Sequence, residues 1–268
     1  VENPVYNRAY RHFDRMGHRV VPAQIDHSGV MPEPLEQLEE AILYTTPSHQ
    51  YPLGLCMPMA RRIQLLNWCS RKPMRYIIED DYDSEFRFDA HPKPAMQALD
   101  ASGRVIYMNT FSKSLAPSIR ISYMVLPRHL MAEFQQKLGF YSCTVPSFEQ
   151  YTLARFISGG WFEKHINRMR KFYKQRRNTV VSLLENCAFS EYLTILEQDA
   201  GLHFLLQVKT PLTDRQLTGR LAEAGIKIRA LSEYYHDSQA DRHCLVVNYS
   251  GIKEENLTEA LEALKKIM

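Results

Sequence analysis

The sequence of 268 residues has few cysteines, no long apolar run and almost no charge imbalance. Its five cysteines are scattered and form no Cys-x-x-Cys pair, which argues against a disulfide framework and against a zinc site. No apolar run approaches the length of a membrane span, and the opening residues do not form a signal peptide. The net charge of +3 is too small to indicate nucleic-acid binding by itself. These absences favour a cytoplasmic protein with reduced thiols and no membrane partner.

Apolar residues are plentiful enough for a large core, since 45% of the chain is hydrophobic and 24% is charged. In the first half, short apolar runs alternate with segments that carry apolar residues at helical spacing. The expected strands are 18–22, 42–44, 76–78, 105–108 and 121–126, the expected helices are 34–40 and 57–71, and 29–32 is an expected turn. This alternation predicts an α/β fold with a mainly parallel, buried sheet flanked by helices.

The second half shows a different pattern. Helices are expected at 128–138, 147–157 and 161–186, and the last of these is long, amphipathic and densely basic. We interpret its charges as a solvated face, because no aromatic stacking series accompanies them. Strands are then expected at 193–196, 202–208 and 244–247, with helices at 213–224 and from 254 onwards. This part predicts a compact α+β unit.

Polar residues follow two of the expected strands. The run 76–78 is followed by EDDYD, and the run 105–108 is followed by NTFSKS. In open α/β sheets, ligands bind outside the carboxyl ends of the strands. We therefore expect Asp80, Tyr82 and Lys113 to face the same crevice.

These residue types suit pyridoxal phosphate. Lysine in a partly enclosed pocket can form a Schiff base with a carbonyl, and a carboxylate such as that of Asp80 can keep the ring nitrogen protonated. Tyr82 could donate a hydrogen bond to the phenolic oxygen of the ring. Arg120 could grip the phosphate together with the hydroxyls of Thr110 and Ser112. Taken singly these signals are weak, because a lysine between serines or a run of acids is usually a solvated loop.

The combination is more specific. EDDYDSEFRF followed by TFSKSLAPSIRISYMVLP resembles the aminotransferase-like domain of the MocR/GabR-type bacterial transcriptional regulators, which belong to the fold-type I pyridoxal-phosphate superfamily. The segments VENPVYNRAY, TTPSHQYPLG and WFEKHINRMRKFYKQRR extend the resemblance over nearly the whole chain. It implies that Lys113 carries the cofactor, and that an effector with an amino group displaces the lysine.

The resemblance also implies a division of the chain. Residues 1–158 would be a large, partial cofactor-binding domain, 159–188 the interdomain helix, and 189–268 a small C-terminal domain. The opening VENP suggests a fragment that lacks a winged helix-turn-helix domain and a glycine-rich phosphate contact. We therefore expect DNA to be a partner only through a domain missing from this chain, and we expect a homodimer.

Two residues near the start complete the implied site. Tyr6 matches a tyrosine that stacks on the cofactor ring, and Arg8 matches an arginine that binds the carboxylate of an effector. Without the motif, a core tyrosine and a surface arginine would be the simpler interpretation.

One position departs from the family pattern. Some members use a second arginine from the small domain, and Glu233 stands near that place in this chain. Arg229 and Arg242 are nearby substitutes, so the identity of the effector stays open.

Three interpretations compete for the function. The first is the effector-sensing domain of a regulator with little or no turnover, and it is the one we favour. The second is a working aminotransferase, in which Lys113 would also shuttle a proton. The third is a fragment that no longer holds the cofactor and only folds or dimerises.

Overall fold

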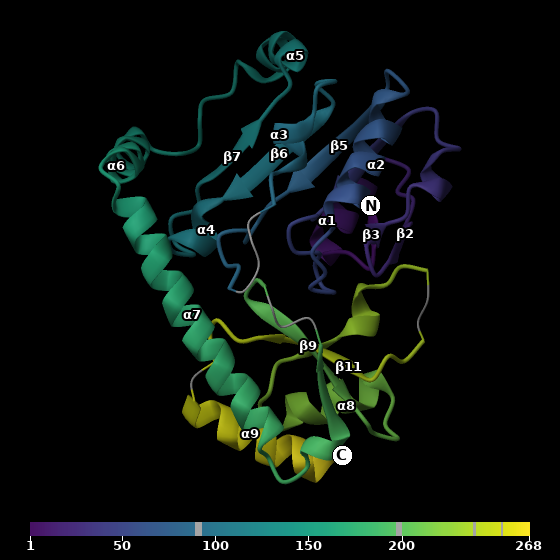
Figure 1. Cartoon of the computed structure of the whole chain (residues 1–268), viewed down its shortest axis with the longest axis vertical. Coiled ribbons are helices and arrows are strands. Elements are labelled where there is room, and N and C mark those ends of the chain that lie inside the picture. Colours follow the sequence, from purple (N-terminus) through teal and green to yellow (C-terminus); the bar gives the residue numbers. More distant parts are fainter. Residues whose placement is uncertain (89–92, 197–199, 238–239, 253) are drawn as a thin grey trace.

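The computed structural model describes residues 1–88, 93–196, 200–237, 240–252 and 254–268. These residues form two four-stranded sheets, one in each half of the chain and joined along one side by a long helix, and a small three-stranded sheet (Figure 1). No helix within these ranges is long and apolar enough to cross a membrane. All five cysteines are free thiols.

The sheet that matters for the site has four strands in the order β4-β5-β6-β7. They are β4 (Ala41–Thr45), β5 (Arg75–Asp80), β6 (Val105–Thr110) and β7 (Ser122–Val125). The first three run parallel, whereas β7 is antiparallel to β6. The carboxyl ends of β4, β5 and β6 therefore lie at one edge of this sheet, as the sequence predicted.

A small three-stranded sheet lies beside it, formed by β1 (Glu2–Asn3), β2 (Ala23–Asp26) and β3 (Gly29–Val30). The helices of this half are α1 (Asn7–Arg15), α2 (Met59–Ser70), α3 (Met96–Leu99) and α4 (Phe111–Ser114). Leu65 and Trp68 of α2 pack on Leu43 and Ile77 of the sheet, which explains the apolar spacing seen in the sequence.

Three helices follow the first sheet: α5 (Arg128–Leu138), α6 (Ser147–Ser158) and α7 (Trp161–Glu185). In Figure 1, α5 and α6 lie at the periphery, and α7 runs from α6 down to the second sheet. Gly160 begins α7 in a left-handed conformation with φ of 70°, where glycine is favoured.

The second sheet is antiparallel, in the order β10-β11-β9-β8. Its strands are β8 (Leu193–Leu196), β9 (His203–Val208), β10 (Arg229–Ala230) and β11 (Cys244–Asn248). The helices α8 (Asp214–Glu223) and α9 (Glu254–Ile267) accompany this sheet. Thr213 and Gln216 form a capping box at the start of α8.

Several sequence predictions for local elements were wrong. The strand expected at 18–22 lies at β2 instead, beyond Pro22, whose ring nitrogen cannot donate to a sheet. The helix expected at 34–40 is one 3-10 turn, Glu33–Leu35, and the turn expected at 29–32 begins with the strand β3. The run 121–126 was expected to be buried, but β7 is an edge strand whose residues are all exposed.

A buried ion pair fixes the carboxyl end of β5. The side chains of Arg62 and Glu79 are both fully buried, with 3.7 Å between nitrogen and oxygen. Glu79 also accepts the backbone N–H groups of Met96 and Gln97, each at 2.9 Å. Arg62 donates to the carbonyl of Pro47 at 2.9 Å, which ties the loop after β4 to the same point. Removing one partner of such a pair leaves an uncompensated buried charge.

We expect Arg62→Ala to lower the free energy of unfolding by about 3–5 kcal/mol, because Glu79 would lose its buried counter-charge. Urea unfolding followed by circular dichroism measures the loss. The matched control is Arg71→Ala, which removes an exposed pair with Glu36 and should cost no more than about 1 kcal/mol. Equal midpoints for the two variants would contradict the structural role of the buried pair.

Candidate functional site

Three polar loops meet at the carboxyl edge of the first sheet. They follow β4, β5 and β6 and contain His49, Tyr82 and Lys113 respectively. The parallel register aligns Thr45 with Glu79 and Asp80 with Met108, so neighbouring strands end close together. The sequence prediction that these ends share one region therefore agrees with the fold.

Thr110, Ser112 and Arg120 are brought together at the end of β6. The Oγ1 of Thr110 lies 3.1 Å from the Oγ of Ser112 and accepts the Ser112 backbone N–H at 3.2 Å. Arg120 donates to the Oγ of Ser112 at 3.2 Å and adopts a positive φ of 49°, which is uncommon for arginine. Two hydroxyls and an exposed guanidinium form a set of donors suited to a phosphate.

Lys113 lies in α4, beside this cluster, and its side chain is exposed. Its ammonium makes no hydrogen bond or ion pair with any described residue. Its charge acts on His203 of β9, whose pKa is held well below its usual range by burial first, and by the charges of His49 and Lys113 as well. The lysine amine is therefore available to a ligand and close to the second sheet.

Asp80 ends β5 and accepts a hydrogen bond from the hydroxyl of Tyr44. Burial raises the pKa of Asp80, while the bond from Tyr44 and the charges of Asp81 and Asp83 act on it more weakly and in opposite directions. A cationic partner at this carboxylate would relieve the cost of burying its charge. That need fits a protonated ring nitrogen.

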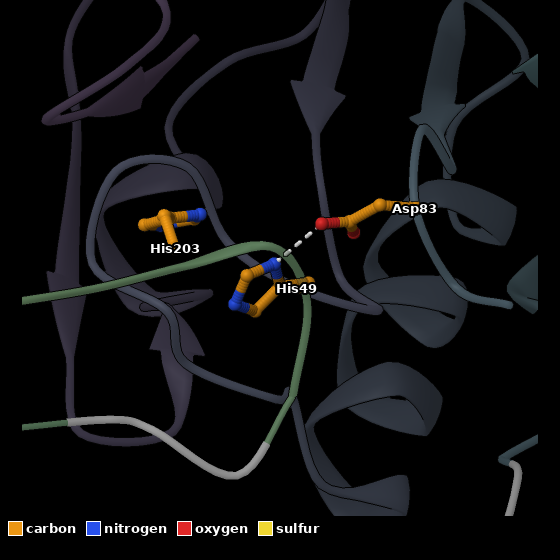
Figure 2. Close-up of side chains that lie close together, drawn as sticks. All are labelled: His49, Asp83 and His203. Atoms are coloured by element: carbon orange, nitrogen blue, oxygen red, sulfur yellow. Dashed lines mark hydrogen bonds and ion pairs between the residues drawn. The ribbon is translucent and has the colours of Figure 1, made fainter. Parts of the chain in front are cut away.

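Tyr82 does not stand alone in the next loop. Its hydroxyl donates to the backbone oxygen of His49 at 3.0 Å and lies 3.1 Å from the Nδ1 of the same residue. The Nδ1 of His49 is also 2.9 Å from the Oδ2 of Asp83. Figure 2 shows this bond, with His203 beside the imidazole of His49. The sequence did not distinguish Asp83 or His203 as residues of the site.

A buried carboxylate holds the loop after β4. Glu2 of β1 is fully buried and accepts hydrogen bonds from the hydroxyls of Thr45 and Thr46, at 2.5 and 2.8 Å. Gln50 donates to Glu2 at 3.2 Å and to the carbonyl of Pro4 at 2.9 Å. Burial raises the pKa of Glu2, and these hydrogen bonds oppose that shift. The network joins β1, β4 and the His49 loop.

Tyr6 and Arg8 lie at the start of α1. Both side chains are exposed, and the ring of Tyr6 packs edge-on against Tyr51 with 5.7 Å between centroids. Tyr51 and Tyr234 join their hydroxyls at 3.0 Å, which connects this region to the second sheet. Arg8 has no ion-pair partner in the described ranges.

Glu233 is occupied by its own turn. Its side chain accepts the backbone N–H of Ala230 at 2.9 Å, and its backbone oxygen accepts a hydrogen bond from Asn7 at 2.9 Å. The side chain of Glu233 is therefore bonded within its own turn. Of the two substitutes, Arg242 lies over the ring of Tyr235, while Arg229 acts electrostatically on Tyr51.

Glu85 has a strongly perturbed carboxyl group. Burial raises its pKa to about 7, and the charges of Asp81 and Asp83 add to the shift. One of its carboxyl oxygens, Oε2, is buried without a hydrogen-bond partner among the described residues. Its backbone oxygen accepts from Arg170 of α7, so the residue lies where α7 meets the site loops.

The chain matches the model of the family "Aminotransferase class I and II" over residues 3–264. It is 39% identical over 264 residues to the uncharacterized HTH-type transcriptional regulator YdeL of Bacillus subtilis, covering 98% of this chain and 56% of the relative. It is 35% identical over 265 residues to the probable rhizopine catabolism regulatory protein MocR of Rhizobium meliloti, covering 99% and 53%. The chain thus spans about half the length of these curated relatives.

A solved structure is also similar. The kynurenine aminotransferase of Pyrococcus horikoshii, solved with PMP, superposes with a TM-score of 0.83 at 28% identity and covers 99% of this chain and 67% of that one. The mixed sheet flanked by helices agrees with this aminotransferase fold.

We expect Glu85→Gln to stabilise the protein above pH 7 by about 1–3 kcal/mol and to have little effect near pH 4.5. Between about pH 4.5 and pH 7, Glu85 ionises in the unfolded chain but keeps its proton in the folded protein. The free energy of unfolding of the wild type therefore falls as the pH rises through this range. Glutamine never ionises and avoids that loss.

Urea unfolding at pH 5 and pH 8 measures the difference. Glu133→Gln is the control, since its carboxyl is exposed, has its pKa lowered by Lys137, and should give no gain at pH 8. A constant effect of Glu85→Gln at both pH values would show that Glu85 is not protonated in the folded state.

Proposed function

The chain belongs to the aminotransferase class I and II family, and we propose that it is the pyridoxal-phosphate-binding, effector-sensing part of a bacterial transcriptional regulator of the MocR/GabR type. The observation that carries the proposal is Lys113, which follows Ser112 of the Thr110–Ser112–Arg120 cluster and whose exposed amine has no hydrogen-bond or ion-pair partner among the described residues. Family membership implies pyridoxal phosphate as the cofactor.

The residues of this chain suit that cofactor. Thr110, Ser112 and Arg120 would hold its phosphate, and Asp80 would face its ring nitrogen. The Tyr82 hydroxyl would face the phenolic oxygen of the ring, and Tyr6 would stack on the ring. When bound, pyridoxal phosphate supplies an aldehyde carbon open to primary amines and a ring that withdraws electrons. Lys113 supplies the resident amine.

Effector sensing would follow from competition between Lys113 and the amine of the effector for the aldehyde carbon of the cofactor. An effector with a primary amine would release Lys113, and an effector carboxylate would pair with the exposed Arg8. Arg229, near Tyr51, is a second cation available to a carboxylate. The effector can shift the protein only if it binds one conformer better than another.

DNA binding would reside in a part of the protein outside this chain. YdeL, the relative named as an HTH-type regulator, is about twice as long as the matched region, which supports this assignment. A cytoplasmic location follows from the proposal, since the target is the bacterial chromosome.

A second candidate function is transamination of amino acids. The similarity to the kynurenine aminotransferase of Pyrococcus horikoshii favours it, because 99% of this chain superposes on that enzyme. The two functions differ in turnover. A regulator would bind an amine without converting added keto acids.

We further propose that the protein forms a homodimer through exposed aromatic residues of α6 and of the segment before it. Phe140 and Tyr141 precede α6, Phe148 and Tyr151 lie on it, and the four side chains are 67–79% exposed. Phe148 and Tyr151 are three residues apart and share one face of α6. Exposed apolar patches of this kind mark interaction sites.

We expect Lys113→Ala to abolish the covalent attachment of pyridoxal phosphate. Borohydride reduction of the loaded protein, followed by peptide mass spectrometry, should find the phosphopyridoxyl group on Lys113 in the wild type only. Lys137→Ala, which removes an exposed lysine of α5, is the control and should trap cofactor normally. Equal trapping in Lys113→Ala would refute the assignment.

A panel of amino compounds then separates the two functions. A regulator should show a spectral change with one class of amine and no sustained production of keto acid. Continued turnover with added 2-oxoglutarate would select the aminotransferase.

We expect the double variant Phe148→Ser with Tyr151→Ser to weaken self-association by about tenfold or more, because two large aromatic side chains leave the interface. Sedimentation velocity over a concentration series measures it. Ile63→Ser, which alters a single exposed apolar residue of α2, is the control. A wild-type protein that stays monomeric throughout would contradict the proposed dimer.

A further inference from the structure

The loop after β4 is clamped between the two halves of the molecule. His49, at its centre, is only 2% exposed. On one side it touches Tyr82 and Asp83 from the loop after β5. On the other side it meets His203, the first residue of β9, and Gly201, which lies two residues before that strand.

The hydrogen bonds of His49 fix its tautomer. An ionised Asp83 can only accept, so the Nδ1 of His49 carries the hydrogen and donates to the Oδ2 of Asp83 at 2.9 Å. The Tyr82 hydroxyl then gives its hydrogen to the His49 backbone oxygen, and its own oxygen lies 3.1 Å from the same Nδ1. Asp83 thereby orients the imidazole, and the imidazole lies against the phenol.

Gly201 packs against His49 and Asp83 on the face of the imidazole toward the second sheet. A Cβ at this position would come within 2.0 Å of the His49 Nδ1, 1.9 Å of its Cε1 and 2.7 Å of the Asp83 Oδ2. Gly201 is itself held, because its N–H donates to the carbonyl of Phe86 at 2.8 Å and its oxygen accepts from the hydroxyl of Tyr249. Only a glycine can lie so close to His49.

His203, two residues after Gly201, also contacts the loop after β4. Its ring lies 4.5 Å from that of His49, and its Nε2 is 3.1 Å from the backbone oxygen of Pro52. Movement of β9 relative to the first sheet would therefore disturb His49 at both contacts.

A metal ion is a poor explanation for this cluster. His49, Asp83 and His203 are a ligand set by type, with ligand atoms within 4.8 Å of one another. However, the His49 Nδ1 already lies 2.9 Å from the Asp83 Oδ2, and the His203 Nε2 lies 3.1 Å from the backbone oxygen of Pro52. Hydrogen bonds within the protein therefore already occupy these ligand atoms.

We propose that His49 is a positioning residue for the Tyr82 hydroxyl, and that the seating of Gly201 against His49 couples the position of the second sheet to that hydroxyl. This inference rests on the proposed function, in which Tyr82 faces the ring oxygen of the cofactor. It adds a route by which a shift of the second sheet changes the hydrogen bonding at the cofactor ring. The titratable groups around Tyr82 are His49, Asp83, Asp80, Tyr51 and Glu2.

The first test uses two substitutions of His49. His49→Leu removes the nitrogen, whereas His49→Asn keeps an N–H at the place of Nδ1. In the protein loaded with pyridoxal phosphate, the pH midpoint of the visible absorption should move by about one unit in His49→Leu and by less than about 0.3 in His49→Asn. His129→Leu breaks a similar contact to Tyr76 and should leave the midpoint unchanged.

The second test compares two glycines. Gly201→Ala and Gly160→Ala introduce the same side chain at φ of 68° and 70°, but only the first meets His49, since nothing lies within 4 Å of the second. Gly201→Ala should move the midpoint in the same direction as His49→Leu, and Gly160→Ala should not. Equal midpoints in wild type, His49→Leu and Gly201→Ala would overturn the proposal.

Two further measurements keep the outcome decisive. If His49→Leu does not fold, the pair His49→Leu with Asp83→Leu replaces both partners by apolar groups and carries the same expectation. In the chain without cofactor, tyrosine labelled with ¹³C at Cζ, with Tyr82→Phe to assign the signal, should show the Tyr82 resonance shifted in His49→Leu and restored in His49→Asn. A colourless wild type would refute the proposed cofactor, while an unmoved resonance would refute the role of His49.

Discussion

The whole site depends on the shared direction of β4, β5 and β6. Parallel strands end at one edge of a sheet, and the loops that leave this edge carry charged and hydroxyl groups that would be costly to bury alone. Two buried carboxylates at the strand ends offset that cost, because they accept hydrogen bonds from the loops and pair with a buried cation. Glu2 collects hydrogen bonds from the β4 end, and Glu79 pairs with Arg62 while accepting two backbone N–H groups. With these anchors fixed, the loops that carry His49 and Tyr82 are held at the edge of the sheet.

The charges of the site are divided by burial. The acids of the β5 loop lie inside, where burial raises the pKa of Asp80 and of Glu85. The cations Lys113 and Arg120 are exposed. A ligand with a cationic ring nitrogen at one end and a phosphate at the other would match both groups at once. This arrangement favours one orientation of a ligand across the edge of the sheet.

The sequence predicted the part of the site that is local. Thr110, Ser112, Lys113 and Arg120 lie within eleven residues at the end of one strand, so the spacing alone indicated their proximity. The contacts that His203 and Gly201 make with the loop after β4 join the two halves of the chain. Hydrophobic periodicity indicates local elements and cannot predict contacts between residues so far apart in the sequence. The exposure of β7 was also missed, because an edge strand and a central strand can have equally apolar sequences.

The contacts across the two halves bear on how a sensor could work. Tyr51 bonds Tyr234, His203 bonds the backbone of Pro52, and Gly201 leaves no space above His49. All three meet the single loop after β4, which the Glu2 network holds rigidly to the first sheet. A displacement of the second sheet cannot be absorbed by that loop without breaking buried hydrogen bonds, and a packed interface of this kind tends to move between discrete arrangements. A ligand that binds at Lys113 and contacts the second sheet would therefore favour one arrangement over another, which is the differential affinity that sensing requires.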